Sequence, residues 1–178
     1  MALGATIYKL ELHVADMSRG YYGSHALTLA RHPSETVERM MLRALAFALF
    51  ADERLAFTRG LSTADEPALW RKDLTDAVED WIDLGHPDER RLAQASGRAR
   101  RVAVLCYGGQ ASKVWWQGVQ GKAARLSNLS VLAVEPEAVR SLGALAERGM
   151  TLHVSIDEGS VQVSSGAGSV ALDVAVWH

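Results

Sequence analysis

The chain has 178 residues, of which 48% are hydrophobic and 22% are charged, and its formal net charge at pH 7 is -2. These values are typical of a soluble globular protein, and a chain of this length buries about two thirds of its unfolded surface. The nearly neutral charge excludes a general attraction to nucleic acid, so a polyanion site has to be a local patch. We predict a single domain that spans residues 1–178.

Cys106 is the only cysteine, which excludes an internal disulfide bond and a cysteine-based zinc site. It lies in the apolar run 102–107, where we expect an unreactive core thiol. The N-terminal segment 1–14 lacks the cationic start and apolar run of a secretory signal. Because no apolar stretch approaches the roughly 20 residues that span a membrane, we expect a cytoplasmic protein without a membrane segment.

The first third of the chain predicts two antiparallel strands followed by a helix. Apolar and polar residues alternate over 5–14, which predicts a half-buried strand, and a turn at 16–23 leads to a second strand at 24–31. A nearly continuous apolar run then predicts a buried helix over 35–51, with Ser34 as its N-cap. Glu38 lies at the edge of the apolar stripe, where it either complements the helix dipole or directs its carboxylate into a site.

The middle of the chain predicts a βαβ unit. Strands are expected at 55–59, 68–72 and 78–85, a helix at 87–97 and a strand at 102–107. The last strand is fully apolar, which is typical of a central parallel position. Asp83 lies one step from the C-terminal end of its strand, and βαβ units place functional groups at the C-terminal ends of their strands.

The last third predicts mainly strands. The pattern indicates strands at 113–117 and 129–134, a helix at 136–148, and further strands at the end of the chain, namely 151–156, 161–163 and 170–177. Alternation in the first of these strands places Trp115 and Trp116 on opposite faces of a sheet. We therefore expect core packing for both rings and not the stacking of a nucleobase.

Two kinds of charged residue are candidates for chemistry. A magnesium site needs one or two carboxylates together with water and a substrate phosphate, and Glu38 and Asp83 are predicted to converge on such a site, with Arg90 or Arg91 facing the phosphate. The ion would activate water and neutralise the leaving oxygen. The alternative remains open that Asp83 faces solvent and that the arginines form a solvated helix face.

A series of arginines follows Asp83 and forms the densest positive charge in the chain. Such a patch either contacts the phosphates of a nucleic acid, independently of base sequence, or complements the dipole at the C-terminal end of the helix. Both interpretations are open. The five residues of the series are Arg90, Arg91, Arg98, Arg100 and Arg101.

Several blocks of sequence follow one another along nearly the whole chain. The longest are Arg31-His-Pro-Ser-Glu-Thr-Val-Glu-Arg-Met-Met-Leu-Arg43 and Trp81-Ile-Asp-Leu-Gly-His-Pro-Asp-Glu-Arg91. Shorter ones are Asp52-Glu-Arg-Leu, Phe57-Thr-Arg-Gly, Asp65-Glu-Pro, Val114-Trp-Trp and Asn128-Leu-Ser-Val131. Together, in this order, these blocks resemble the YaeQ family of small bacterial proteins.

This resemblance implies an α/β fold with a restriction-endonuclease-like core, in which helices flank a mixed central sheet, here extended by a C-terminal β-hairpin. Active enzymes of that fold hold magnesium with Pro-Asp on one strand and (Asp/Glu)-x-Lys on the next. Glu38 and Asp83 fit two of the acidic positions. Ala68 stands where an acid is expected and Gly85 where lysine is expected, so the resemblance implies that Glu66 replaces the acid and that Arg90 or Lys72 replaces the lysine.

Two functions are consistent with these observations. The first is a module with a degenerate active site that binds nucleic acid or a protein partner through the arginine-rich helix. The second is a Mg²⁺-dependent nuclease-like phosphodiesterase in which Glu38, Asp83 and Glu66 hold the metal. The missing acid and lysine favour the first function, whereas the acids predicted to point inward favour the second.

Overall fold

The computed structural model describes residues 4–178, and within them the chain forms a mixed α/β fold with four α-helices and two mixed sheets. Two compact units are present. Unit 1 comprises the segment that ends at Ala51 together with Glu137–Asp173, and unit 2 comprises Asp52–Pro136 and Val174–His178. The prediction of one mixed central sheet is therefore wrong, because each unit has its own sheet. That the whole chain is one domain stays a prediction.

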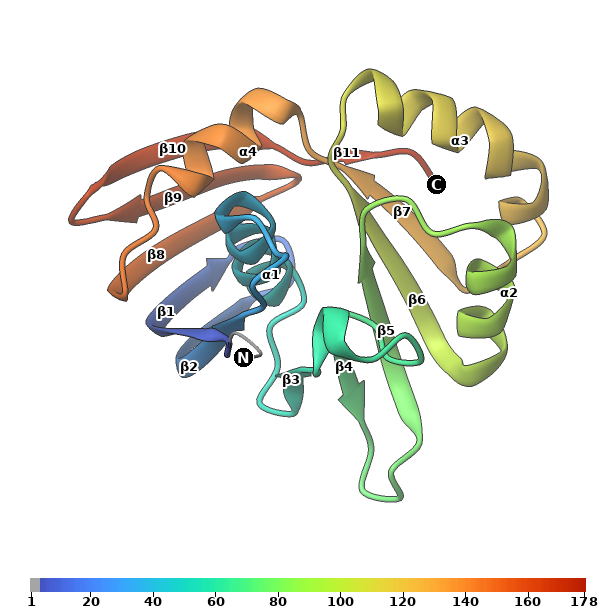
Figure 1. The fold of residues 1–178 in the computed structure, drawn as a ribbon, viewed down its shortest axis with the longest axis horizontal. Helices are drawn as coiled ribbons and strands as arrows, with labels where there is room; N and C mark the ends of the chain where they lie inside the picture. Colours follow the sequence, from blue (N-terminus) through green and yellow to red (C-terminus); the bar gives the residue numbers. More distant parts are fainter. Residues whose placement is uncertain (1–3) are drawn as a thin grey trace. The chain divides into compact units, whose positions relative to one another are not determined.

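The sheet of unit 1 has five strands in the order β10-β9-β8-β1-β2 (Figure 1). Strands β1 and β8 are parallel, and the other neighbours are antiparallel. The strands are β1 (Thr6–Asp16), β2 (Tyr21–Arg31), β8 (Gly149–Asp157), β9 (Ser160–Ser165) and β10 (Gly168–Asp173). The predicted C-terminal hairpin is present as β9–β10, but β8 joins it to β1, so it is part of this sheet and not an extension.

One face of this sheet carries the core of unit 1, since alternate residues of β1 such as Leu10, Leu12 and Val14 are buried. Helix α1 (Val37–Leu49) packs on β1 and β2. Helix α4 (Pro136–Gly143) ends against α1, because a Cβ added to Gly143 would lie 2.9 Å from Cγ of Glu38. The predicted helix 136–148 is thus too long, and the chain re-enters the sheet at Gly149.

Unit 2 is built around the predicted βαβ unit. Its sheet has the order β11-β7-β6-β5-β4-β3, with β5, β6 and β7 parallel. The strands are β3 (Leu55–Phe57), β4 (Leu69–Lys72), β5 (Val78–Leu84), β6 (Ala99–Cys106), β7 (Leu129–Ala133) and β11 (Ala175–Val176), and the helices are α2 (Glu89–Arg98), α3 (Gln110–Ala123) and the short 3-10 helix η1 (Gly60–Ser62).

Helices α2 and α3 cover one face of this sheet (Figure 1) and close a core that includes Trp81, Leu92, Val104 and Val131. Cys106 belongs to this core and is fully buried, as predicted, and burial raises the pKa of its thiol. Trp81 and Ile82 point to opposite faces of β5 and are both buried, so the strand is covered on both faces.

The strand predicted at 113–117 lies instead within α3. Gly109 is the N-cap of α3 and has a positive φ of 59°. Within the helix, Ser112, Val119 and Ala123 are buried at helical spacing. Trp115 and Trp116 therefore do not face opposite sides of a sheet, and both pack against the core of unit 2. The segment 113–117 has only five residues, with three consecutive apolar ones, and so short an apolar run is compatible with either a strand or a helix.

No helix within residues 4–178 combines the length and the apolar character needed to cross a membrane. Residues 1–3 of the N-terminal segment, for which no secretory signal is predicted, lie outside the described residues.

The N-cap of α1 is Thr36 and not the predicted Ser34. The Thr36 hydroxyl accepts a hydrogen bond of 3.1 Å from the backbone N–H of Arg39, whereas the Ser34 hydroxyl contacts Nδ1 of His32 at 2.6 Å. The substitution Thr36→Ala is expected to lower the free energy of unfolding by about 1 kcal/mol, measured by urea denaturation, because a helix N–H loses its partner.

The matched control is Ser34→Ala, which removes an equally exposed hydroxyl that caps nothing and is expected to change stability by less than about 0.5 kcal/mol. A larger loss in Ser34→Ala than in Thr36→Ala would contradict this assignment of the cap.

Candidate functional site

The candidate site lies where β5 passes into α2. Strand β5 ends at Leu84, and Gly85 turns the chain with a φ of 98°. Asp88 is the N-cap of α2, and its carboxylate accepts a hydrogen bond of 2.8 Å from the backbone N–H of Arg91. This cap fixes the first turn of the helix and directs the Arg91 side chain back towards the strand.

Asp83 and Arg91 form a two-point ion pair. Nε of Arg91 lies 2.9 Å from Oδ2 of Asp83, and Nη2 lies 3.0 Å from Oδ1. Asp83 is only 5% exposed. The hydrogen bond that Arg91 donates to the Asp83 carboxylate holds the pKa of Arg91 above its usual value, although burial acts against it. Both oxygens of this carboxylate are thus engaged by a fixed positive charge.

Arg91 also joins a third segment to this pair. Its Nη1 donates to the carbonyl oxygen of Ala64 at 2.5 Å, and its Nη2 donates to that of Glu66 at 2.8 Å. The guanidinium lies 5.6 Å from the centre of the Trp81 ring. Arg91 therefore holds together β5, α2 and the loop before β4, and its donors are used within the protein.

Glu66 and Lys72, which were also predicted for the site, have partners of their own. The Glu66 carboxylate accepts hydrogen bonds from Arg59, from Nη2 at 2.9 Å and from the backbone N–H at 3.0 Å, and the side-chain bond lowers the pKa of Glu66. Lys72 lies 3.5 Å from Asp76 and 4.0 Å from the centre of the Trp70 ring. The charges of Glu66 and Lys72 are thus paired with Arg59 and Asp76, and neither of these contacts involves Asp83.

Glu38 lies in the first turn of α1 and is half-buried. It belongs to unit 1, whereas Asp83 and Glu66 belong to unit 2. That Glu38 and Asp83 converge therefore stays a prediction. Among the described residues 4–178, no three His, Cys, Asp or Glu side chains are grouped closely enough to hold a metal ion.

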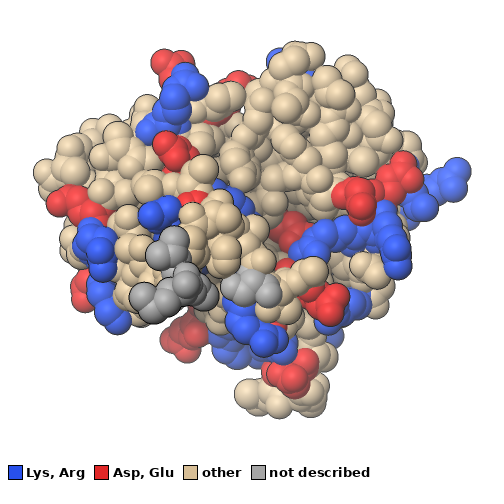
Figure 2. Space-filling view, viewed as in Figure 1, with Lys and Arg blue, Asp and Glu red and all other residues tan. Residues whose placement is uncertain are grey.

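The five arginines predicted to contact nucleic acid divide into two groups. Arg91 is held as described, Arg98 donates to the Asp65 carbonyl at 3.0 Å, and Arg101 lies 2.8 Å from Asp80. Arg90 and Arg100 are exposed, and the charge of Arg100 contributes to lowering the pKa of Asp73. Figure 2 shows lysine and arginine atoms gathered around the position of α2, with acidic atoms between them.

Sequence reasoning missed one feature near this site. Arg71 binds Asp80 at 2.6 Å and Glu79 at 2.8 Å, because β4 and β5 are antiparallel neighbours with Arg71 opposite Asp80. The charges on the two predicted strands were a usable signal, since opposite charges pair across neighbouring strands. His86, which the sequence also places just after β5, has its Nε2 2.7 Å from the Ser112 hydroxyl, and burial lowers its pKa.

The substitution Arg91→Met is expected to lower the free energy of unfolding by about 3 kcal/mol, measured by urea denaturation, because it leaves the Asp83 carboxylate buried without a counter-charge. Adding Asp83→Asn to this variant is expected to recover part of the loss, since the two residues are directly coupled.

Arg90→Met on the same turn of the helix is the control, and a change below about 0.5 kcal/mol is expected because the side chain is exposed. Equal losses in Arg90→Met and Arg91→Met would show that the ion pair does not stabilise this site.

The chain is similar to known proteins over essentially its whole length. The family model described as "YaeQ protein" matches residues 1–174. "Uncharacterized protein YaeQ" from Salmonella typhi is 46% identical, and that from Escherichia coli K12 is 45% identical; both alignments cover 100% of this chain and 98% of the relative.

Two solved structures are also similar. The crystal structure of YaeQ protein from Xanthomonas axonopodis pv. citri has a TM-score of 0.96 at 51% identity and covers 98% of both chains. That from Pseudomonas syringae has a TM-score of 0.92 at 41% identity and covers 98% of this chain and 96% of the other. The resemblance predicted from the sequence blocks is thus confirmed, and the chain belongs to the YaeQ family.

Proposed function

We propose that this protein binds nucleic acid through a basic surface formed by α2 and the start of β6, and that it does not cleave the bound strand. The observation that carries this proposal is the Asp83–Arg91 ion pair. It removes a carboxylate from metal binding, whereas Arg90 and Arg100 are among the exposed cations of the surface.

The fold is proposed to be a variant of the restriction-endonuclease-like core. The chain order of α1, β3, β4, β5, α2 and β6 matches the helix, three strands, helix and strand of that core. In this frame, Asp83 corresponds to the second metal-binding acid of the active enzymes. An arginine that binds both of its oxygens replaces the metal ion by a protein cation.

The two departures from the enzyme motif support the same conclusion. Ala68, at the position of the first acid, is buried and only 4% exposed, so the surroundings are built for an apolar side chain. Gly85, at the position of the lysine, has a φ of 98°, a conformation that a lysine adopts only with strain. Local backbone geometry thus disfavours restoration of the enzyme motif at this turn.

The proposed surface is narrow. Helix α2 has ten residues and so is about 15 Å long, with Arg90 at its start and Arg98 and Arg100 at its end. Asp88 and Glu89 beside Arg90 reduce the local positive charge. We therefore expect affinity that depends strongly on salt and little on base sequence.

The double substitution Arg90→Ala/Arg100→Ala tests this surface. Binding of a labelled oligonucleotide is measured by fluorescence anisotropy across a salt series. The slope of log K against log salt concentration is negative. Its magnitude is expected to decrease by about 0.9 per arginine on duplex DNA, or about 0.7 on a single strand, because fewer counterions are released.

The matched control is Arg140→Ala, which removes an exposed arginine of α4 in unit 1. Its slope is expected to equal that of the wild type. An unchanged slope in the double variant would exclude this surface, and binding of an acidic protein in place of the oligonucleotide would indicate a protein partner.

A metal titration separates this proposal from a Mg²⁺-dependent nuclease, in which Glu38, Asp83 and Glu66 would hold the ion. Since Arg91 neutralises Asp83 and Arg59 neutralises Glu66, millimolar Mg²⁺ or Mn²⁺ is expected to leave the Tm of the wild type unchanged. A metal-dependent rise in Tm that disappears in Asp83→Asn would contradict this expectation and favour the nuclease.

A further inference from the structure

The sheet of unit 1 has a second, outer face that is polar and open to solvent. Alternation along β1 buries Leu10, Leu12 and Val14 and turns the residues between them outward. The same alternation in β2, β8 and β9 presents small and hydroxylated side chains on this face. Such a surface is too polar to act as a core and has a regular spacing set by the strands.

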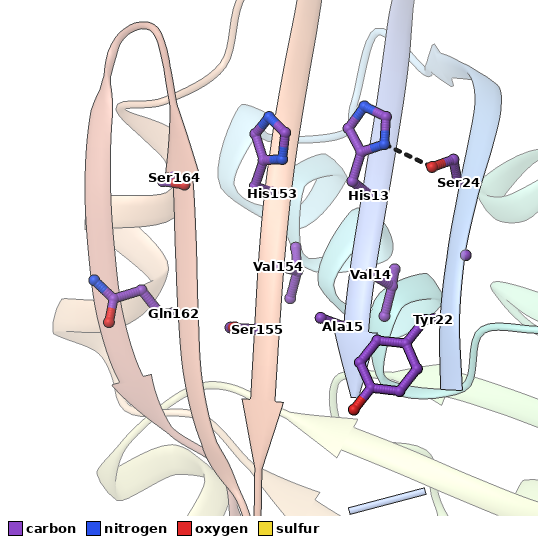
Figure 3. Close-up of a pocket in the computed structure, with 11 residues that line it drawn as sticks. His13, Val14, Ala15, Tyr22, Ser24, His153, Val154, Ser155, Gln162 and Ser164 are labelled. Carbon is purple, nitrogen blue, oxygen red and sulfur yellow. Dashed lines mark hydrogen bonds between the residues drawn. The ribbon is translucent and has the colours of Figure 1, made fainter. Parts of the chain in front are cut away.

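The register of the strands brings two imidazoles together at the centre of this face. His13 on β1 is paired with His153 on the parallel strand β8. Their ring centres are 4.8 Å apart and their planes differ by 18°, so the rings are stacked. Nδ1 of His13 lies 2.7 Å from the Ser24 hydroxyl on β2, as the dashed line in Figure 3 shows.

A shallow cavity of about 530 Å³ lies over this pair (Figure 3). Its lining includes the aromatic ring of Tyr22, which is 66% exposed, and the polar groups of Ser155, Gln162 and Ser164. Ser155 and Gln162 are exposed and Ser164 is half-buried, and their hydroxyl and amide groups can act as donors and acceptors. No lysine, arginine, aspartate or glutamate lines the cavity.

This composition selects among ligand classes. A lone phosphate is disfavoured because the lining carries no permanent cation. A shared metal ion is disfavoured because the lone pairs of stacked imidazoles lie in nearly parallel ring planes and do not converge on one point. Planar rings beside uncharged hydrogen-bonding groups suit a flat, polar, aromatic ligand. A nucleobase has a π-face that stacks on aromatic side chains and edges that form hydrogen bonds.

We propose that the outer face of this sheet is a nucleobase site for single-stranded nucleic acid. The base stacks on Tyr22 or on the exposed ring of His153, and Ser155, Gln162 and Ser164 bind its edge. Tyr22 lies opposite Ala15, next to the His13 position along β1, so that the rings are spaced as neighbours on one sheet. The choice of ligand class rests on the proposed nucleic-acid function, but the site lies wholly within unit 1.

The test uses the full chain and a fluorescein-labelled oligo(dT) of about 12 nucleotides, which is within the length that one single-strand site covers. Tyr22→Ala and His153→Ala are each expected to weaken binding by at least about five-fold, whereas Tyr22→Phe retains the ring and is expected to bind as the wild type does. Thr28→Ala, on the same face outside the cavity, is the control and is expected to have no effect.

A salt series separates this site from the arginine surface. Stacking releases few counterions, so Tyr22→Ala is expected to lower affinity at every salt concentration without changing the slope. The arginine variant changes the slope instead. If the arginine variant alone loses affinity, the nucleobase site is wrong while the proposed function stands; if the ring variants alone lose affinity, the nucleobase site is supported while the arginine surface fails.

An NMR titration gives a readout that is independent of the oligonucleotide. A nucleoside monophosphate is expected to shift the imidazole signals of His13 and His153, assigned through His13→Gln and His153→Gln, and inorganic phosphate is expected not to. Equal shifts with phosphate alone would overturn base recognition in favour of a simple anion site. Absence of any shift, with ring variants that bind oligo(dT) like the wild type, would overturn the proposal entirely.

Discussion

The ion pair between Asp83 and Arg91 determines what the charged residues of unit 2 can do. A carboxylate at 5% exposure needs a partner, because desolvation of an isolated charge is costly. Arg91 meets that need with two hydrogen bonds and uses its remaining donors on the carbonyls of Ala64 and Glu66. Asp83 and Arg91, both predicted as functional residues, therefore neutralise each other. The arginines that point outward are the ones that can contact a ligand.

Unit 1 also contains a buried carboxylate that is paired with arginines, at a position outside the proposed sites. Glu35 is buried before α1 and accepts hydrogen bonds from Arg39 at 2.5 Å and from Arg43 at 2.7 Å. Arg43 also donates to the Ala30 carbonyl at the end of β2. These bonds fix the helix to the strand that precedes it. In both units, then, buried charge supports architecture, whereas the proposed binding surfaces use exposed arginines in one unit and uncharged polar groups in the other.

Sequence patterns predicted the elements well where burial followed a simple period. The alternation in β1 and the strand–helix–strand order from Val78 to Cys106 both reflect local side-chain placement. The prediction of a strand at 113–117 was wrong because five residues are too few to distinguish the helical period from that of a strand. The burial pattern of the helix becomes visible only over the longer segment from Ser112 to Ala123. The predicted N-cap of α1 was wrong for a related reason. Ser34 and Thr36 both carry a hydroxyl that can cap a helix, and only the backbone position at which the helix begins distinguishes them.

The sequence by itself determined the family, the order of most elements and the residues able to carry charge, because these depend on residue type and short-range periodicity. Only the tertiary structure decided which of them meet. Asp83 binds Arg91 because the turn at Gly85 and the cap at Asp88 fold α2 back over β5. His13 stacks on His153 because two strands distant in the chain become parallel neighbours in one register. Such pairings arise from packing across the fold, and no local pattern encodes them.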